Sequence, residues 1–531
     1  MQKYISRINQ GNMLNYWALI ESLKIKMRLN ILFGGKAGQG INKVSEIVAN
    51  ILSSLGYFTF NYRDYGSLIR GGHNFNILSI SDKRVGSYES KIDGIVALDE
   101  NTLKLHKNKL KKNSFVVSFE KFDDSGRNLN IALAGALIKI FGIDKIILID
   151  EIKKEFGNKE ALDAASAGYV SEKERFKLGR LNNKIRVMTG SQSVALGAIN
   201  SKIDLYFAYP MTPATEVMHR LASKQVEHNI MVFQPESEIA VVNSALGASF
   251  AGARVMVGTS GGGFDLMTEA FSFQGQSEIP LVVYFASRGG NSTGLPTYSG
   301  QGDLDAALRA GHGEYPRVVI APGDPIECIE KTNEAFYLAE KFNSLSIILS
   351  DKNLAESEFS SDRKENEVLK VETKSKVGEE IVKKSSYEHD KFGNTTESGE
   401  IAKENAERLL KKYEDLKKEA RKFEMIKIYG NKDSKNLIIS WGSTKCQILD
   451  AIENLDCKFL QVLYIKPMSN KIREELEKAE NVILIEQNST GQLGRVIREK
   501  TGIKIEKRIL KYDGRPFASD ELRRLVEEKL R

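Results

Sequence analysis

Cysteine is scarce in this chain of 531 residues, in which only Cys328, Cys446 and Cys457 occur. They lie too far apart in sequence for the C-x-x-C pairs that bind zinc or iron–sulfur clusters. Three widely spaced thiols also cannot build the disulfide framework of a small secreted domain. The cysteine content therefore argues against a metal cluster within this chain and favours a reducing, cytoplasmic location.

Long apolar runs are also missing. A helix that spans a membrane needs about 18 or more apolar residues in a row, and the chain has no such run. Residues 1–26 mix polar and aromatic side chains and lack the apolar core and cleavage site of a signal peptide. Because Met27 directly precedes the first predicted strand, we interpret residues 1–27 as an extension without an assigned role.

Neither sign of charge is in large excess. The 77 basic and 70 acidic residues leave a net charge of +7, which is a small difference between large numbers. A solvated Lys-rich surface explains it better than a nucleic-acid footprint, so we expect neither a nucleic acid nor a membrane as a partner. With 41% hydrophobic and 28% charged residues the chain is typical of a soluble globular protein. Its length predicts three to four domains of about 150 residues each.

The segment 28–175 starts with a strand, a glycine-rich turn and a helix. Residues 29–33 are an apolar strand, residues 34–40 are the turn, and residues 41–55 show helical spacing of apolar side chains. The turn lacks the Lys and Ser/Thr that end a P-loop. It could bring an anion to the helix start, or it could serve only close packing of helix and sheet, and both interpretations stay open.

A second motif, residues 67–74, places an arginine, two glycines, His73 and an asparagine between two predicted strands. It could contact a phosphate, a carboxylate or another subunit, although a single histidine is more often structural. Further apolar strands are predicted at 95–98, 115–118 and 146–149. Strands that alternate with helices predict a parallel α/β domain over 28–175.

Three further regions follow a charged linker at 170–184. Residues 185–350 are predicted to form a second α/β domain, with strands at 205–208, 231–233, 255–258, 281–286 and 318–321. Residues 351–427 are rich in Lys, Glu and Ser and predict a solvent-exposed excursion that ends in an exposed helix at 400–422. Residues 428–531 are predicted to form a third, smaller α/β domain.

A rigid turn follows the predicted strand 205–208 and has the sequence Tyr209-Pro210-Met211-Thr212-Pro213. In open α/β folds, ligands bind at the carboxyl edge of the sheet, where this turn is expected to lie. The two prolines restrict the backbone and would hold the Thr212 hydroxyl in one place. The competing interpretation is a simple turn into the next helix.

Two charged side chains are placed in a similar way. Glu238 begins a helix of small residues, which permits close packing at an interface, and the free N–H groups there stabilise a carboxylate. It could hydrogen-bond a nitrogen heterocycle, whereas Glu236 could take that role instead, or either could be a plain helix cap. Arg288 follows the strand 281–286 and suits bidentate binding of a carboxylate or a structural salt bridge.

Together these segments resemble the alpha subunit of 2-oxoacid:ferredoxin oxidoreductases, in the 2-oxoglutarate synthase form with a gamma domain fused at its N-terminus. The family motifs Y-P-I-T-P, T-S-G-P-G-x-x-L-M-x-E, R-G-G-P-S-T-G-L-P-T and E-H-D-x-x-G-x-x-T-E are similar to residues 209–213, 259–269, 288–297 and 388–397. The glycine turn and the motif at 67–74 look like the gamma domain. The resemblance implies a gamma domain at 28–175, a pyrimidine-type thiamine diphosphate domain at 185–350, and a transketolase C-terminal-like domain at 428–531.

The resemblance also implies an activity and a set of site residues. The family converts a 2-oxoacid to acyl-CoA and CO₂ with reduction of ferredoxin, and we expect 2-oxoglutarate as the preferred substrate, with pyruvate accepted. Glu238 would hydrogen-bond the aminopyrimidine of thiamine diphosphate and activate it, with Tyr209 and Pro210 beside the cofactor. The 2-oxoacid would be bound by Thr212, Arg288, Thr297 and Asp390, with Arg288 on its carboxylate.

The chain lacks the G-D-G and downstream Asn that hold Mg²⁺ and diphosphate, and it lacks a cysteine cluster. The resemblance therefore implies a separate beta subunit that supplies Mg²⁺, the iron–sulfur cluster and the other part of the cofactor site. Coenzyme A would be the co-substrate, and ferredoxin would be reached through an αβ or (αβ)₂ assembly. This chain alone is expected to be inactive.

Two departures from the family pattern keep an alternative open. Gly262 and Asn291 replace prolines of the family motifs, which is expected to relax both loops, and the region 355–387 looks abbreviated. A non-catalytic paralogue that only binds partners or a nucleotide is therefore the alternative function. A dinucleotide-dependent enzyme built on the glycine turn is a third interpretation, but no acidic ribose-binding residue lies in a convincing place.

Overall fold

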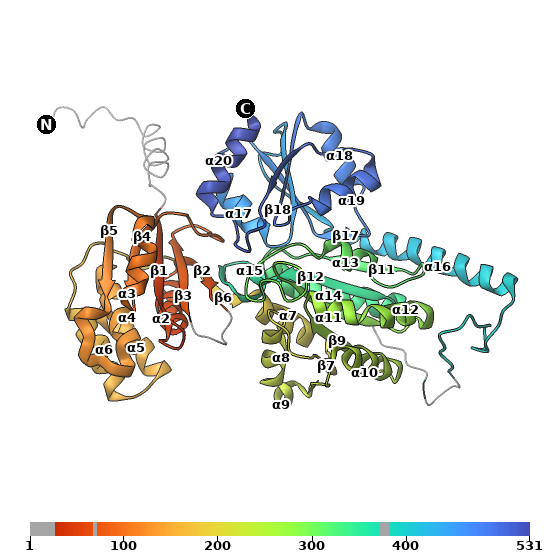
Figure 1. Cartoon of the computed structure of the whole chain (residues 1–531), viewed down its shortest axis with the longest axis horizontal. Coiled ribbons are helices and arrows are strands. Elements are labelled where there is room, and N and C mark those ends of the chain that lie inside the picture. Colours follow the sequence, from red (N-terminus) through yellow and green to blue (C-terminus); the bar gives the residue numbers. More distant parts are fainter. Residues whose placement is uncertain (1–26, 67–71, 371–376, 378–381) are drawn as a thin grey trace, which may run out of the picture.

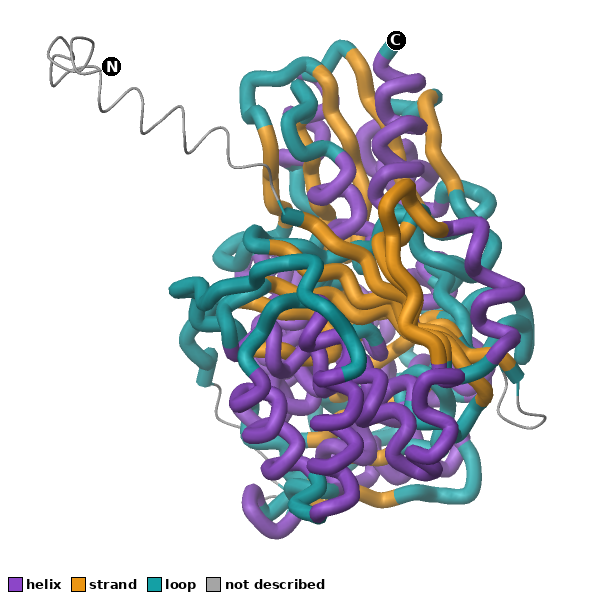
Figure 2. Tube along the Cα trace, turned by 90° about the vertical axis from the view of Figure 1, so that its left-hand side faces the viewer, coloured by secondary structure: helices purple, strands orange, loops and turns teal. Residues whose placement is uncertain are grey.

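The computed structural model describes residues 27–66, 72–370, 377 and 382–531. Their strands form three β-sheets, each covered by helices (Figure 1). The units built on the first and second sheets lie side by side, and the third unit, which carries the C-terminus, sits over both (Figure 1). Seen from the first unit, its helices gather on one side of its strands (Figure 2). The α/β fold class predicted from the sequence is confirmed.

The first sheet is mixed, not parallel as predicted. Its order is β5-β4-β1-β3-β2-β13-β6, with β1 Arg28–Lys36, β2 Phe58–Asp64, β3 His73–Ser81, β4 Ile92–Ala97, β5 Leu110–Ser118, β6 Arg186–Thr189 and β13 Glu358–Ser361. β1 pairs in parallel with β4, but β3 is antiparallel to both β1 and β2. A parallel pairing needs a crossover of a dozen or more residues, and the connection from β2 to β3 is shorter than that.

The prediction of a strand at 146–149 is wrong, because these residues lie in α5, Lys145–Glu155. The Asp144 side chain caps this helix by accepting a hydrogen bond of 2.9 Å from the Ile146 amide. Leu148 and Ile152, four residues apart, are the two side chains that α5 buries. The Asp144 cap and the helical spacing of Leu148 and Ile152 therefore favour a helix over the strand that the isoleucine-rich run 146–149 indicates. The other α-helices of this unit are α2 Ile41–Ser54, α3 Glu100–His106, α4 Leu129–Ile140 and α6 Lys159–Val170.

The second sheet has the order β17-β11-β12-β10-β9-β7-β8 and contains all five strands predicted for residues 185–350. Its strands are β7 Leu205–Phe207, β8 Met231–Phe233, β9 Val255–Thr259, β10 Leu281–Ser287, β11 Arg317–Ile320, β12 Leu345–Asp351 and β17 Tyr464–Lys466. All its pairs are parallel except β11 with β17. Its helices are α7 Gly190–Asn200, α8 Thr215–Ala222, α9 Gln225–His228, α10 Glu238–Phe250, α11 Gly261–Leu266, α12 Thr268–Ser277, α13 Leu304–Arg309, α14 Pro325–Phe342 and α15 Lys352–Glu356.

The start of the charged segment 351–427 is not the solvent-exposed excursion that its composition predicts. In α15 the residues from Lys352 to Ala355 are buried, and β13 then joins the first sheet between β2 and β6. The Lys352 ammonium donates to the Arg63 carbonyl oxygen and lies 3.6 Å from the Glu356 carboxylate, which satisfies its charge inside the protein. The exposed helix near the end of the segment is confirmed as α16, Gly399–Ala420.

The third sheet has the order β14-β16-β15-β18-β19, and only β14 runs antiparallel to its neighbour. Its strands are β14 Ile426–Gly430, β15 Asn436–Trp441, β16 Lys458–Val462, β18 Asn481–Glu486 and β19 Lys507–Leu510, and its helices are α17 Thr444–Ala451, α18 Lys471–Lys478, α19 Gln492–Thr501 and α20 Ser519–Leu530. No helix among the described residues is long and apolar enough to cross a membrane. The predicted domain boundaries stay a prediction. Three strands cross between units: β6 and β13 belong to the first sheet, and β17 belongs to the second.

Candidate functional site

Three parallel strands of the second sheet end at one edge. β9 lies between β7 and β10 and is parallel to both. The turn 209–213 follows β7, α11 starts soon after β9, and Arg288 directly follows β10. Because the carboxyl edge of such a sheet is where ligands bind, the segments predicted from the sequence meet at the expected place.

Arg288 and Thr212 are in direct contact. Nη1 of Arg288 donates a hydrogen bond of 3.2 Å to the Thr212 carbonyl oxygen. The Arg288 Nε is buried and has no hydrogen-bond partner among the described residues. Burial lowers the pKa of this guanidinium, and the nearby Asp303 carboxylate raises it. The Arg288 guanidinium is therefore fixed by one hydrogen bond and still has an N–H group free to donate. A carboxylate ligand requires such an arrangement.

Thr297 ties this edge to the first unit. Its hydroxyl donates a hydrogen bond of 2.7 Å to the carbonyl oxygen of Tyr65, which follows β2. Residues 67–71, the first part of the predicted motif 67–74, lie outside the described residues. From the rest of that motif, His73 places its Nε2 within 2.9 Å of Nε2 of His106. The Thr297 hydrogen bond thus brings the end of β2 against the candidate site.

Glu238 is a buried carboxylate with no hydrogen-bond or ion-pair partner for its side chain among the described residues. It is 5% exposed and begins α10. The cap of α10 is Ser237, whose hydroxyl accepts a hydrogen bond of 3.3 Å from the Ala240 amide, so Glu238 does not serve as the cap. A Cβ added at Gly263 would lie 2.8 Å from Oε1 of Glu238, so only glycine permits this close approach of α11. A buried carboxylate without a partner is costly, which indicates that it faces a ligand.

Comparisons with known proteins agree with this geometry. Residues 196–425 match the family model "pyruvate flavodoxin/ferredoxin oxidoreductase, thiamine diP-bdg", and residues 30–125 match "pyruvate ferredoxin/flavodoxin oxidoreductase". The chain is 30% identical to the 2-oxoglutarate synthase subunit KorA of Methanocaldococcus jannaschii, over 65% of this chain and 99% of that protein. The chain belongs to the alpha-subunit family of 2-oxoacid:ferredoxin oxidoreductases.

Two further relatives extend the match over nearly the whole chain. The 2-oxoacid:ferredoxin oxidoreductase subunit alpha of Saccharolobus solfataricus is 29% identical, over 94% of this chain and 97% of that protein. A solved structure of the 2-oxoglutarate:ferredoxin oxidoreductase from Magnetococcus marinus, with 2-oxoglutarate, coenzyme A and succinyl-CoA bound, is similar with a TM-score of 0.86. It is 25% identical, and the likeness covers 96% of this chain and 100% of that one.

The alpha-subunit family uses thiamine diphosphate, and the carboxyl edge fits its aminopyrimidine end. Glu238 supplies a carboxylate on a buried side chain, and the Ser260 hydroxyl is buried without a partner among the described residues. Gly262, which replaces a family proline, lies in the first turn of α11, where a Cβ would meet no atom within 4 Å. Proline is tolerated in a first helical turn, and α11 forms without it. No group of three or more His, Cys, Asp or Glu side chains in the described ranges is placed to hold a metal ion.

The remaining predicted residues lie at the rim or elsewhere. Tyr209 and Pro210 are exposed beside the edge. Asp390 accepts hydrogen bonds of 2.9 Å from the amides of Phe392 and Asn394, within its own loop, and these lower its pKa. The structure does not bring Asp390 into contact with Thr212 or Arg288, so its role in binding substrate stays a prediction.

The sequence interpretation missed Asp303, which lies behind Arg288. Its Oδ2 accepts a hydrogen bond of 2.6 Å from the Ser287 hydroxyl. Burial raises the pKa of Asp303, and the Arg288 guanidinium opposes that shift. The signal that could have found it is an acidic residue after two glycines, only fifteen positions beyond Arg288.

Glu216, at the start of α8, was also missed. Its Oε1 accepts a hydrogen bond of 3.1 Å from the Thr189 hydroxyl at the end of β6. Burial raises the pKa of Glu216 to about 7, and the nearby Arg63 guanidinium opposes that shift. The negative charges of the nearby Glu356 and Glu358 raise the pKa of Glu216 further.

Replacing Glu216 with Gln is expected to change the pH dependence of stability. The folded-state pKa of about 7 lies above the ordinary 4.5, so the native state binds more protons between these values. Wild-type stability is therefore lost as the pH rises from about 4.5 to 7. The E216Q variant lacks this loss. Its free energy of unfolding should therefore rise relative to that of wild type by on the order of 3 kcal/mol across that pH window. Urea unfolding at several pH values measures the difference. The exposed Glu227→Gln is the control, and a pH-independent E216Q difference would contradict the assignment.

Proposed function

We propose that this chain is the catalytic alpha subunit of an enzyme that oxidises 2-oxoglutarate to succinyl-CoA and CO₂, accepts pyruvate less well, and reduces ferredoxin. The observation that carries the proposal is the buried, unpartnered Glu238 at the same sheet edge as Arg288. The substrate preference is supported by the bound 2-oxoglutarate in the similar structure from Magnetococcus marinus. The retained Glu238 and Arg288 also count against a non-catalytic paralogue.

Each side chain has a separate task in this proposal. Thiamine diphosphate, when bound, supplies the carbon nucleophile that attacks the 2-oxo group. The Glu238 carboxyl group would hydrogen-bond the aminopyrimidine and control the proton on its ring nitrogen. Arg288 binds the substrate carboxylate, and the Thr212 carbonyl holds the guanidinium in position through its 3.2 Å hydrogen bond. Thr297 lies at the same edge, where its hydroxyl holds the Tyr65 carbonyl oxygen, and its predicted contact with the 2-oxoacid stays a proposal.

The cofactor site is completed by a separate beta subunit, which contributes Mg²⁺ and the iron–sulfur cluster. Support comes from apolar side chains on the same edge of the second unit that are about half exposed. The exposed fractions are 49% for Phe233, 52% for Ile239 and 52% for Leu266. On α10, Gly247 lies two turns from Ile239, and a Cβ there would meet no atom within 4 Å. This face of α10 and α11 is proposed as the surface on which the beta subunit packs.

Replacing Ile239 with Asp is expected to abolish co-purification of the beta subunit and reduce activity of the mixture at least about 10-fold, because a charge would be buried in the interface. The melting temperature of the alpha chain alone should change little, since Ile239 is half exposed. Val170→Asp is a matched control, because Val170 is 74% exposed on the first unit. Retention of the beta subunit by the I239D chain would remove α10 from the interface.

Co-expression with the beta subunit tests the function itself. The assembled complex should reduce ferredoxin or viologen only when a 2-oxoacid and coenzyme A are both present, and kcat/KM should be higher for 2-oxoglutarate than for pyruvate. No reduction with any 2-oxoacid from a correctly assembled complex would overturn the proposal and favour the non-catalytic paralogue.

A further inference from the structure

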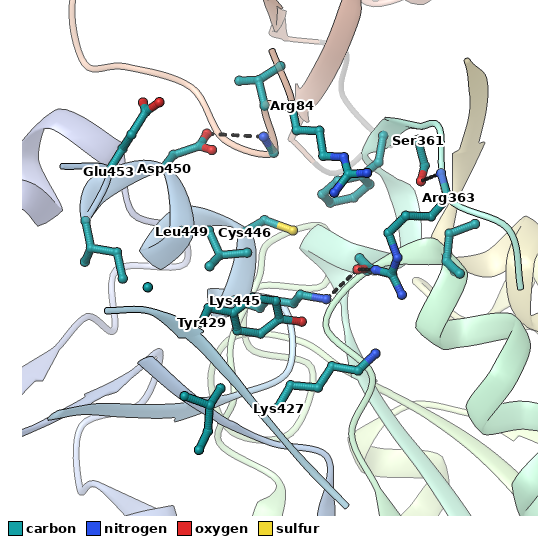
Figure 3. A pocket seen from close by; sticks show the side chains of 18 of the residues that line it. Arg84, Ser361, Arg363, Lys427, Tyr429, Lys445, Cys446, Leu449, Asp450 and Glu453 are labelled. Carbon is teal, nitrogen blue, oxygen red and sulfur yellow. Dashed lines mark hydrogen bonds and ion pairs between the residues drawn. The ribbon is translucent and has the colours of Figure 1, made fainter. Parts of the chain in front are cut away.

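A cavity of about 780 Å³ lies where the three units meet (Figure 3). The first sheet contributes Arg84, from the loop after β3, and Phe359 of β13. The second unit contributes the start of α14, and the third contributes β14, α17 and the residues after α17. Pockets for small molecules have volumes of about 300–1,000 Å³. None of the residues proposed for catalysis lines this cavity.

One wall of the cavity carries three cations, Arg363, Lys427 and Lys445 (Figure 3). Asp324, which also lines the cavity, accepts from Nη1 of Arg363 at 2.7 Å and from Lys445, and the buried Glu327 accepts from Lys445 at 2.6 Å and Lys427 at 3.1 Å. Burial lowers the pKa of each cation, but the two carboxylates raise it by more, so all three stay protonated. These three positive charges therefore share the buried Glu327 and the partly buried Asp324. The other carboxylates that line the cavity are Glu424, Glu453 and Asp450, and Asp450 pairs with Arg28 at 3.3 Å.

The other ion pairs of this wall are solvent-exposed and exchangeable. Lys427 also lies 3.1 Å from Glu424, whose side chain is 54% exposed. Arg84 pairs with Asp362 at 2.8 Å, and the Arg84 side chain is 66% exposed. Exposed pairs of this kind contribute about 1 kcal/mol or less. An anion that enters the cavity can therefore replace Glu424 and Asp362 at little cost, and it then meets the three cations of the inner wall.

The remaining walls are largely apolar. Val85 comes from the first unit, and Leu449 and Ile452 come from α17 and its end. The ring of Tyr429 lies against the Lys445 ammonium, at 5.4 Å, while its hydroxyl donates to Gln461 at 3.2 Å. An inorganic anion alone would leave most of this apolar surface and volume unfilled. The occupant thus needs an anionic group at one end and a ring-sized apolar body at the other.

We propose that this junction cavity binds a nucleotide-like organic anion, with its phosphate against Arg84, Arg363 and Lys427 and its ring against Val85 and Leu449. Because the walls come from all three units, the bound anion also ties these units together. A ligand that binds only the assembled, folded junction stabilises it by mass action. The site is therefore expected to couple the level of such an anion to the packing of the first unit on the other two.

Calorimetric titration of the co-expressed complex with AMP tests the proposal. AMP should bind at one site per alpha chain, at least about 10-fold more tightly than adenosine or inorganic phosphate, because the cavity needs both ends of the ligand. Arg84→Ala and Arg363→Gln should each raise the dissociation constant for AMP at least about 10-fold. Arg84 is exposed, so its replacement should leave the melting temperature of the ligand-free complex unchanged. Absence of saturable AMP binding would overturn the proposal.

A second experiment distinguishes AMP binding in this cavity from AMP binding at the glycine turn. It is needed because coenzyme A also carries an adenosine phosphate. Lys36→Ala, in that turn, should leave AMP binding unchanged, and saturating coenzyme A should not displace AMP. If K36A abolished AMP binding while R84A and R363Q did not, the cavity would not be the site. Both experiments measure AMP binding and not enzyme activity, so failure of this proposal can be distinguished from failure of the proposed function on which the complex rests.

Discussion

Replacing Glu238 with Gln is expected to lower kcat of the assembled complex by about 10²–10⁴-fold, which is the usual range for removing a positioned acid–base group. Glu238 is 5% exposed and begins α10 at the carboxyl edge of the second sheet. Its amide replacement keeps the volume beside Gly263 but cannot exchange the proton on the aminopyrimidine. KM for the 2-oxoacid should change little, because Arg288 still binds the carboxylate. Steady-state assays at saturating thiamine diphosphate measure both constants.

The same variant should be at least as stable as wild type when the cofactor is absent. The Glu238 carboxylate has no hydrogen-bond or ion-pair partner among the described residues, so the neutral amide breaks no interaction there. A loss of activity together with an unchanged or raised melting temperature therefore separates a ligand-facing role from a structural one. Glu236→Gln is the matched control, since Glu236 lies two residues away and is exposed. If E236Q lost activity and E238Q kept it, the roles of the two glutamates would be reversed.

The sequence predicts this edge well because its signals are local. The strands β7, β9 and β10 are short apolar runs bounded by glycine or proline, and parallel strands must end at a common edge. The proximity of Thr212 and Arg288 follows from that rule alone. What the rule does not give is the contact itself, in which the Thr212 carbonyl oxygen accepts a hydrogen bond from Arg288.

Several features that the sequence analysis does not give depend on distant partners. Lys352 is charged, yet it is buried because the Arg63 carbonyl and Glu356 satisfy its ammonium. The raised pKa of Glu216 arises from burial and from Glu356 and Glu358, which are about 140 residues away in the chain. β17 pairs with β11 across more than 140 residues. Composition and periodicity describe short windows, so they cannot report pairings of this kind.

The strands that cross between units link the candidate site to distant parts of the chain. β13 follows α15 and inserts next to β2, and β2 leads to Tyr65, whose carbonyl oxygen accepts from Thr297. The predicted gamma domain is therefore not a separate attachment to the candidate site. It is held against the carboxyl edge of the second sheet by backbone pairing on one side and by the Thr297 hydrogen bond on the other. Proposed substrate binding at Arg288 depends on that packing.

Replacing Arg288 with Ala is expected to reduce kcat/KM for the 2-oxoacid at least about 100-fold, since loss of a desolvated charge pair costs roughly 2–5 kcal/mol. Most of the loss should appear as a raised KM, because the guanidinium binds the same carboxylate before and during the reaction. Arg288→Lys should recover only part of it, since an ammonium cannot form the bidentate contact. Initial rates over a range of 2-oxoglutarate concentrations measure these values.

The folded state should tolerate this change, which makes the test decisive. Among the residues that the structure describes, the Arg288 side chain has one hydrogen bond, to the Thr212 carbonyl oxygen, and its Nε has no partner, so its removal breaks little internal structure. The melting temperature of R288A is expected to stay near that of wild type. Arg220→Ala is a matched control, because Arg220 is exposed on α8 close to the same turn. An R288A complex that kept wild-type KM and kcat would remove Arg288 from the carboxylate site. The substrate would then have to be held by donors on the beta subunit.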